Sequence, residues 1–504
     1  MASLNATALT VFVPLFAVVT VLGFVASRWR RADLSEIGEW GLGGRRFGSV
    51  VVWFLLGGDL YTAYTFIAVP ALMFGAGAMG FFAVPYTILV YPLMFVVFPR
   101  LWAVAHANGY VTSADLVHGK FGSSTLALVV ALTGILATMP YIALQLVGIE
   151  VVLEGLGIHG EWPLFIAFVV LAAFTYTSGL RAPALIAVVK DLLIYITVIA
   201  AIIVIPEQLG GYGKIFATVP SQKLLLGYAT ASSLGPQAAY ATLALGSALA
   251  LLLYPHAMTG VLSASSQQVI RRNAVVLPAY SVALGLIALL GYMATASGAA
   301  SMPQFAAGFK AFGANFAVPA LFLKSFPSWF VGVAFAAIAI GALVPAAIMS
   351  IACANLFTRN IYKPYFHRGC STAQEGKCAK IASLVVKIGA LAFVIGLPSQ
   401  YAIELQLLGG ILIIQTLPSV ILCLYTSWLN ARALLLGWIA GIGSGIAMWA
   451  SVGFTTTTYN LVLFGMTVPC YAALSSLLLN IVVSIALSSA LNAFARAPID
   501  GRQG

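Results

Sequence analysis

The sequence contains few charged residues. Only 7% of its 504 residues are Asp, Glu, Lys or Arg, whereas 62% are hydrophobic. Soluble domains contain about 25% charged residues, so this composition excludes a soluble protein and indicates a polytopic protein of the cell inner (plasma) membrane, with the lipid bilayer as its partner. The net charge of +11 does not indicate a nucleic-acid partner, because most basic residues fall in alternate loops, where they set membrane orientation.

Cysteine is also scarce, and the five cysteines form no metal-site pattern. Only Cys370 and Cys378 lie in a hydrophilic loop, which we place in the cytoplasm, where thiols stay reduced. Together with His367 they give a spacing that is poor for zinc. HExxH, P-loop and GxSxG motifs are missing from suitable loops, and no basic residue precedes the first apolar run. We therefore expect no enzyme activity, no cofactor and no cleavable signal.

Long apolar runs, by contrast, are abundant and predict thirteen transmembrane helices in an all-α fold. Basic residues in alternate loops place the N-terminus outside and the C-terminus in the cytoplasm. The predicted spans are Thr7–Ala26, Phe47–Phe74, Gly80–Val104, Ser124–Gly148, Trp162–Thr177, Ala184–Ile205, Ala239–Met258, Ala274–Ala296, Trp329–Phe357, Ile381–Leu397, Tyr401–Tyr425, Leu434–Val452 and Leu461–Phe494.

The second span is interrupted in its middle by Gly57, Gly58 and Asp59. Each glycine weakens a helix by about 1 kcal/mol relative to alanine, and an aspartate at this depth costs roughly 2.5–3.5 kcal/mol on insertion scales. A helix that served only as an anchor would contain neither. We therefore predict a helix that breaks within the membrane and turns its free backbone groups toward a cavity. The alternative is a kinked packing helix in which Asp59 bonds a neighbour.

The seventh span is also interrupted, with Gly246 and Ser247 in its middle. The second and seventh spans are five apart, so they run in opposite directions, as in a five-plus-five inverted repeat with discontinuous second and seventh helices. The predicted units are residues 1–46 (first peripheral helix and loop), 47–205 (first repeat), 206–238 (external loop), 239–427 (second repeat) and 428–504 (two peripheral helices and tail).

Polar side chains around these breaks are the candidate substrate ligands. Hydroxyl, amide and free backbone groups can all bind a small polar solute, although hydrogen bonding between helices is the alternative for each of them. The candidates are Gly58, Tyr61, Thr62 and Tyr64 in the second span, Tyr141 and Gln145 in the fourth, and Tyr240 and Ser247 in the seventh.

Three more ionisable residues lie in apolar runs. Lys190 and Asp191 are adjacent, and adjacent residues do not face each other on a helix. We therefore expect Lys190 to reach toward the cytoplasmic surface and Asp191 to meet another helix. His256 follows Pro255 near the cytoplasmic end of the seventh span, where we expect a hydrogen-bonded interfacial histidine rather than a proton relay.

Four short motifs resemble those of the sodium:solute symporter family, and they follow the family's order over residues 40–365. They are Gly41-Leu42-Gly43-Gly44-Arg45-Arg46-Phe47-Gly48, Gly179-Leu180-Arg181-Ala182, Pro255-His256 followed by Arg271-Arg272, and Ala347-Ile348-Met349-Ser350 followed by Asn360-Ile361-Tyr362-Lys363. The resemblance implies the LeuT-type inverted-repeat fold and secondary active transport into the cell, usually driven by sodium.

The resemblance also implies a cation site made by Gly57, Leu60, Ala347 and Ser350. Ile351 stands where the family usually has serine or threonine, so one oxygen ligand is missing. Ile186-Ala187 stands where the family often has a T-D pair. The chain therefore lacks an acidic side chain that helps to bind a second sodium ion in some members. These departures weaken Na+ coupling. We therefore expect coupling to H+ or only weak dependence on Na+, with Asp59 as the candidate proton carrier, since a buried carboxyl favours its neutral form.

The stretch GGDLYTAYTF is similar to the monocarboxylate branch of the family, which implies small acids such as lactate, pyruvate, acetate or propionate as substrates. A helix N-terminus and hydroxyl groups suit a carboxylate. The alternatives are an amino acid such as proline or alanine, and a sugar or polyol. An uncoupled channel or a partner-dependent sensor is a further alternative. We expect the monomer to be functional.

Overall fold

The structure of the chain is a computed structural model that describes residues 4–29, 33–58, 61–160, 162–227, 230, 232–396 and 402–496. The described chain is mostly helical. Its first half contains α1 (Ala6–Val25), α2 (Ile37–Leu42), α3 (Ser49–Gly58), α4 (Val69–Ala76), α5 (Ala83–Ala107), α6 (Ser113–Phe121), α7 (Ser124–Gly155), α8 (Trp162–Ser178), α9 (Arg181–Gln208), α10 (Tyr212–Thr218), α11 (Ser221–Leu224) and α12 (Pro236–Leu251).

The second half is built in the same way, with one short β-hairpin near its end. It contains α13 (Pro255–Leu262), α14 (Gln267–Val276), α15 (Pro278–Ala288), α16 (Leu290–Ser297), α17 (Ala306–Phe312), α18 (Ala317–Ser325), α19 (Ser328–Phe357), α20 (Thr372–Gly396), α21 (Ala402–Ile413), α22 (Leu417–Val420), α23 (Ala431–Ser451), β1 (Thr458–Leu463), β2 (Met466–Tyr471) and α24 (Ala472–Arg496).

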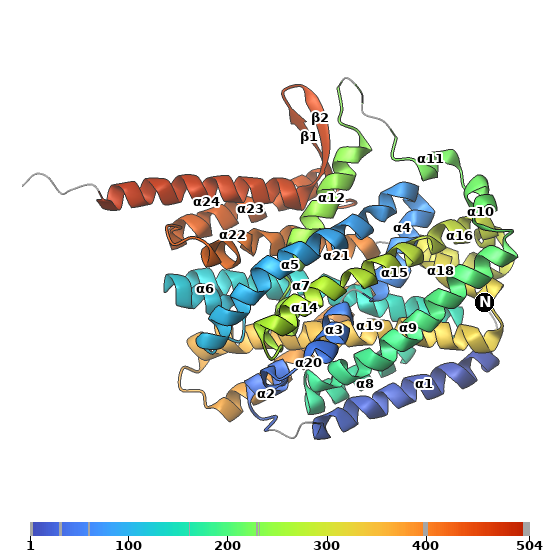
Figure 1. Cartoon of the computed structure of the whole chain (residues 1–504), viewed down its shortest axis with the longest axis horizontal. Coiled ribbons are helices and arrows are strands. Elements are labelled where there is room, and N and C mark those ends of the chain that lie inside the picture. The colour runs from blue at the N-terminus through green and yellow to red at the C-terminus, as the bar shows by residue number, and fades with distance from the viewer. Residues whose placement is uncertain are drawn as a thin grey trace, which may run out of the picture.

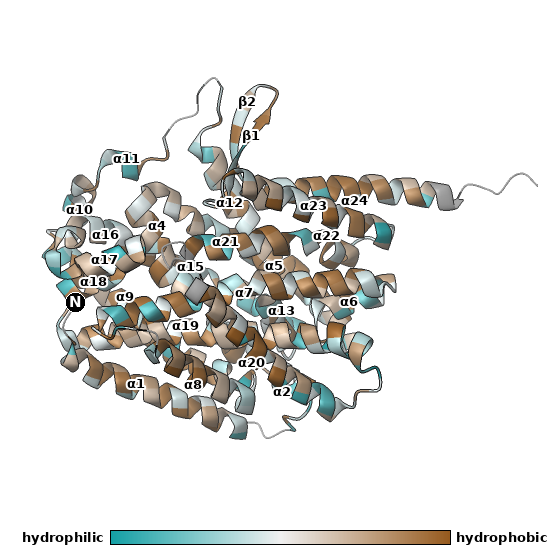
Figure 2. Cartoon of the chain, turned by 180° about the vertical axis from the view of Figure 1, so that it is seen from behind, coloured by the Kyte–Doolittle hydropathy of each residue, from teal (hydrophilic) through white to brown (hydrophobic). Residues whose placement is uncertain are grey.

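Within the described ranges, ten helical stretches are long and apolar enough to cross a membrane, or eleven if α12 and α13 count as one bent span. Two shorter apolar helices, α3 and α8, lie in the predicted second and fifth spans. One stretch that we expected to be an external segment, Pro303–Ser325, is helical and counts among the ten. Hydrophobic residues dominate the long helices, and hydrophilic residues gather at helix ends and in short elements such as α2 and α11 (Figure 2).

The prediction of an all-α fold with a last span that begins at Leu461 is wrong. Residues from Thr458 to Tyr471 form an antiparallel hairpin in which Leu463 pairs with Met466. Phe464 and Gly465 make the turn between the strands with φ values of 50° and 80°, the left-handed backbone that two-residue hairpin turns require. The last helix, α24, therefore begins only at Ala472.

The hairpin is attached to the segment that leads into α12. The backbone N–H of Leu234 donates to the carbonyl of Thr467 at 3.0 Å, and the N–H of Thr467 donates to the carbonyl of Ser232 at 2.7 Å. At the base of the hairpin, the N–H of Tyr471 donates to Oγ1 of Thr242 on α12 at 3.0 Å. The hairpin stands beside α12 (Figure 1) and is hydrogen-bonded both to the segment before that helix and to Thr242 within it.

Helix α19 is the centre of the bundle. In an apolar 18-residue segment of the span that contains α19, 94% of the residues are buried. The corresponding share is 22% for the span of α1 and 28% for the spans of both α23 and α24. It packs against α7, α1, α9 and α20, and its small residues let these helices approach closely, as is typical of helix interfaces in membranes. α1 lies along one edge of the bundle and α23 and α24 along the opposite edge (Figure 1).

Candidate functional site

The second span is interrupted just after the paired glycines, at Tyr61 and Thr62 in the described part of the chain. α3 ends at Gly58, a bend follows at Tyr61 and Thr62, and the chain resumes as a π-helical turn at Tyr64. Turns of this kind occur often at functional sites. The predicted substrate ligands Gly58, Tyr61, Thr62 and Tyr64 are all buried, as is Gly57 of the predicted cation site. Asp59 and Leu60 lie outside the described residues.

Lys190 lies against this break, and our expectation for it is wrong. Its side chain is fully buried, and its Nζ donates to the carbonyl oxygens of Gly58 at 3.0 Å and Tyr61 at 3.2 Å. Nζ also forms an ion pair with Oδ1 of the fully buried Asp191 at 3.0 Å. The rule that adjacent helical residues do not face each other fails here, because the long lysine side chain can fold back while the broken helix offers it free carbonyls.

Asp191 has a second partner, which sequence reasoning missed. The hydroxyl of Tyr280 on α15 donates to Oδ2 of Asp191 at 2.5 Å. Tyr280 also contacts the break, since its ring centroid lies 4.5 Å from that of Tyr61 and the Tyr61 hydroxyl donates to the carbonyl of Tyr280 at 3.3 Å. A single tyrosine in an apolar run carries no signal of such a role. We call Lys190, Asp191 and Tyr280 the lysine triad.

The second half-helix begins with two capped backbone groups. The N–H of Ala63 donates to Oε1 of Gln145 at 3.0 Å, and the N–H of Tyr64 donates to Oγ1 of Thr62 at 3.0 Å. Gln145 and Thr62, which we predicted to contact substrate, thus satisfy backbone donors that a helix N-terminus otherwise leaves free. Tyr141 places its carbonyl 3.3 Å from Nε2 of Gln145, one turn along α7.

Replacing Gln145 with leucine is expected to destabilise the break, because the N–H of Ala63 then stays buried without an acceptor. Loss of a capping acceptor costs about 0.5–2 kcal/mol. We expect a lower melting temperature of the purified protein and slower uptake. Gln145→Glu, which keeps an acceptor oxygen at the same position, is the control and should retain more stability than the leucine variant. Equal melting temperatures for both variants would contradict the capping role.

The seventh span is discontinuous, but its break lies elsewhere than expected. α12 ends at Leu251 and α13 begins at Pro255, with a bend of 48° between them. Gly246, where we expected the interruption, is instead the point at which the ring of Tyr471 packs against α12. Proline starts a new helix readily, since it needs no hydrogen-bonded N–H in the first turn.

Several polar atoms on the broken spans have no hydrogen-bond partner within the described part of the chain. They are the Tyr64 hydroxyl, the Ser247 hydroxyl on α12 and both ring nitrogens of His256 on α13. His256 is fully buried and lacks, within the described residues, the hydrogen bond that we expected, and its ring lies 5.1 Å from that of Tyr254 and 5.4 Å from that of Tyr141. Buried polar groups are normally paired, so these atoms are candidates for ligand contacts. Tyr240 on the same span is only half-buried.

Three residues of the predicted cation site, Gly57, Ala347 and Ser350, are buried, and the fourth, Leu60, lies outside the described residues. On α19, the hydroxyl of Ser350 donates to the carbonyl of Ala347 at 2.8 Å, and Ile351 supplies no side-chain oxygen. The part of α19 that faces the break lies earlier, since a methyl group added at Gly341 would be 3.8 Å from the carbonyl oxygen of Tyr61. The carbonyl oxygens of Gly58 and Tyr61 accept from Lys190, and that of Gly57 accepts from the N–H of Tyr61 at 3.2 Å.

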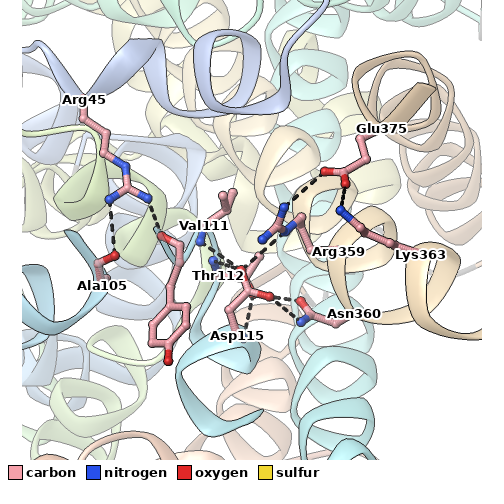
Figure 3. Close-up of polar contacts among 10 residues, drawn as sticks. Arg45, Ala105, Val111, Thr112, Asp115, Arg359, Asn360, Lys363 and Glu375 are labelled. Carbon is pink, nitrogen blue, oxygen red and sulfur yellow. Dashed lines mark hydrogen bonds and ion pairs between the residues drawn. The ribbon is translucent and has the colours of Figure 1, made fainter. Parts of the chain in front are cut away.

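A second polar group gathers residues from two of the recognised motifs. Arg45 donates to the carbonyls of Ala105 at 3.4 Å and Tyr110 at 2.5 Å (Figure 3). Burial lowers the pKa of the Arg45 guanidinium, and the nearby Asp115 carboxylate opposes that shift. These contacts join the segment before α3 to the connection between α5 and α6.

The same group continues into the π-helical turn Thr358–Phe366 after α19. Asn360 donates to Oδ1 of Asp115 at 2.8 Å, and the Arg359 guanidinium lies 3.6 Å from Oδ2 (Figure 3). Arg359 and Lys363 both pair with the buried Glu375 of α20. The motif residues at these positions therefore tie α6 to the segment between α19 and α20.

Comparison with known proteins identifies the same family that these motifs indicate. Residues 40–441 match the sodium:solute symporter family. A "Monocarboxylate transport permease protein" of Rhizobium johnstonii is 54% identical over 98% of this chain and 99% of its own length. An "Uncharacterized symporter YodF" of Bacillus subtilis is 33% identical over 87% of both chains.

The fold has a solved counterpart. A Na⁺-coupled sialic acid symporter in its substrate-bound outward-open state superposes with a TM-score of 0.78 over 96% of this chain and 98% of its own, at 15% identity. The expected resemblance and the expectation of a transporter rather than an enzyme are thus confirmed. The chain belongs to the sodium:solute symporter family.

Proposed function

We propose that the protein takes up small monocarboxylates of the lactate, pyruvate, acetate and propionate class by alternating access, coupled to Na⁺ or H⁺. The observation that carries this proposal is the relative named for monocarboxylate transport, which is 54% identical over nearly the whole of both chains. Lower identity would support the family alone, whereas this relative is similar over 98% of this chain and 99% of its own length.

The chemistry of the breaks supports an anionic substrate of this size. The Tyr64 and Ser247 hydroxyls are buried donors without a protein partner in the described chain, and a carboxylate accepts such bonds strongly. Lys190, the basic side chain beside the break, is already held by two carbonyls and Asp191. A second substrate carboxylate would therefore find no free cation there, which disfavours dicarboxylates.

The proposed architecture is a LeuT-type inverted repeat with thirteen spans, in which residues 47–205 and 239–427 form the halves. The two discontinuous spans, α3 with α4 and α12 with α13, occupy matching places in these halves. α2 and α6 lie at one end of the bundle, and the N-terminus and α10 lie at the other (Figure 1). We place the first end in the cytoplasm because its loops are rich in Arg and Lys, and we take the monomer as the working unit.

Uptake by purified protein in liposomes tests the substrate class. We expect radiolabelled lactate to exchange against internal unlabelled lactate, and external pyruvate, acetate and propionate to compete with it. Proline, alanine and a hexose represent the alternative substrate classes and are tested for exchange in the same way. If one of these exchanges and the short acids do not compete, the monocarboxylate assignment is wrong. Accumulation above equilibrium, which an imposed ion gradient drives, separates the transporter from a channel.

A further inference from the structure

We propose that Lys190 is a cation built into the helix break, and that its ammonium group carries the proton that couples transport. The inference deepens the proposed function and rests on it. It moves the coupling role from Asp59, where the sequence places it, to a residue of α9. It also means that carbonyl oxygens which in a broken helix can coordinate an external ion bind a cation of the protein itself.

The geometry fits a fully charged lysine. An ammonium group has three N–H donors and no acceptor, and three acceptors surround Nζ: Gly58 O at 3.0 Å, Tyr61 O at 3.2 Å and Asp191 Oδ1 at 3.0 Å. Lys190 and Asp191 are both 0% exposed. Two of these donors are used by the carbonyls, and the Asp191 carboxylate supplies the counter-charge. The ion pair is neutral as a whole, which is the form that a buried lysine requires.

This arrangement leaves little for a sodium ion. The Gly58 and Tyr61 carbonyls already accept from the ammonium group, and on α19 Ile351 offers no side-chain oxygen. A cation that approached these carbonyls would also meet the repulsion of a charge fixed in the same place. The site therefore favours the protein's own cation over one from solution.

The groups around the Lys190–Asp191 ion pair explain why the loss of one proton has a large effect on the charge balance at the break. α9 contributes Asp191 and Tyr195, α15 contributes Tyr280, and the bend after α3 contributes Tyr61. Of the other described elements that pack against α9, α1, α3, α8, α15, α16 and α19 contain no Asp, Glu, Lys or Arg, whereas the turn Ala26–Arg28 carries Arg28 and α18 carries Lys324. Within the described chain, Asp191 is thus the sole acidic partner of the ammonium group, and the loss of one proton leaves its charge uncompensated.

The proton step couples directly to the break. Nζ takes one proton from water on the outer side and returns one to water on the inner side, so a cycle moves one proton with one carboxylate and no net charge. A neutral amine has two N–H donors and a lone pair, which cannot bind a carbonyl or carboxylate oxygen. Release of the proton therefore removes the ion pair with Asp191 and turns the amine lone pair against its carboxylate, which displaces Nζ from the carbonyls at the break.

Ion-gradient experiments in proteoliposomes test this role. For the wild type, we expect about tenfold lactate accumulation per pH unit when the inside is alkaline, since one pH unit corresponds to a tenfold factor for one proton. An imposed Na⁺ gradient should add nothing. Lys190→Met should lose the accumulation, while lactate exchange continues at a reduced rate. Lys387→Met is the matched control, because Lys387 is another buried lysine, 1% exposed, on α20. The Lys387→Met protein should accumulate lactate as the wild type does.

Lys190→Arg keeps the positive charge but cannot release a proton, so it should exchange lactate without accumulating it. This variant keeps the proposal falsifiable if Lys190→Met fails to fold. The proposal is overturned if a Na⁺ gradient drives wild-type uptake and pH does not, or if either Lys190 variant still accumulates lactate in response to the pH gradient. If the wild type exchanges none of the short acids, the proposed substrate class fails instead, so the two failures are distinguishable.

Discussion

Asp191→Leu is expected to lower the free energy of unfolding by about 3–5 kcal/mol, because it leaves the Lys190 ammonium group buried without a counter-charge. The ion pair is completely inaccessible to solvent, so water cannot replace the lost carboxylate. The substitution also removes the acceptor of the Tyr280 hydroxyl. The melting temperature of the detergent-purified protein measures the effect, and uptake should fall with it.

The double variant Lys190→Met/Asp191→Leu separates pairing from a general packing defect. Replacing both members of a buried ion pair with apolar residues of similar volume is often neutral or stabilising. We therefore expect the double variant to regain most of the melting temperature that Asp191→Leu loses, but not the pH-driven accumulation. If the double variant melts as low as the single one, Lys190 and Asp191 do not stabilise each other in the way that the structure indicates.

Gly57→Ala is expected to abolish most of the uptake. A methyl group at this position would overlap the ring of Tyr280, which packs directly on the glycine. Tyr280 cannot move aside easily, since it is fully buried and its hydroxyl is bonded to Asp191. Overpacking of this kind costs about 1–3 kcal/mol, which corresponds to a factor of about 5–150 in the population of the working conformation. Initial uptake rates at matched expression measure the loss.

Gly48→Ala is the matched control for this variant. Gly48 lies just before α3, and a methyl group there would meet no atom within 4 Å. Its uptake should stay close to that of the wild type. Wild-type rates in the Gly57→Ala protein would show that the break does not depend on close packing between α3 and α15.

The interruption of the second span was predictable because its sequence conflicts with its surroundings. Two glycines and an aspartate are costly in the middle of a membrane helix, and α3 ends at Gly58. The position of the break in the seventh span was harder to predict, because this span contains two helix-weakening features. Gly246 serves close packing with Tyr471, and the bend occurs before Pro255. A glycine alone does not distinguish a contact from a break.

The lysine triad was not predictable from the chain. The ion pair of Lys190 with Asp191 depends on the carbonyls that α3 leaves free more than a hundred residues earlier, and Tyr280 comes from another helix. The hairpin was missed for a different reason. Short apolar runs do not distinguish strand from helix by periodicity, although Gly465 in its turn was an available signal.

The attachment of the hairpin to α12 has a mechanical consequence. Backbone bonds join Thr467 to Ser232 and Leu234, and the Tyr471 N–H is bonded to Thr242. If α12 tilts or slides during a transport cycle, the hairpin must travel with it or these bonds must open. Phe464 at its tip is fully exposed, so a displacement of α12 that kept these bonds would move an exposed part of the molecular surface.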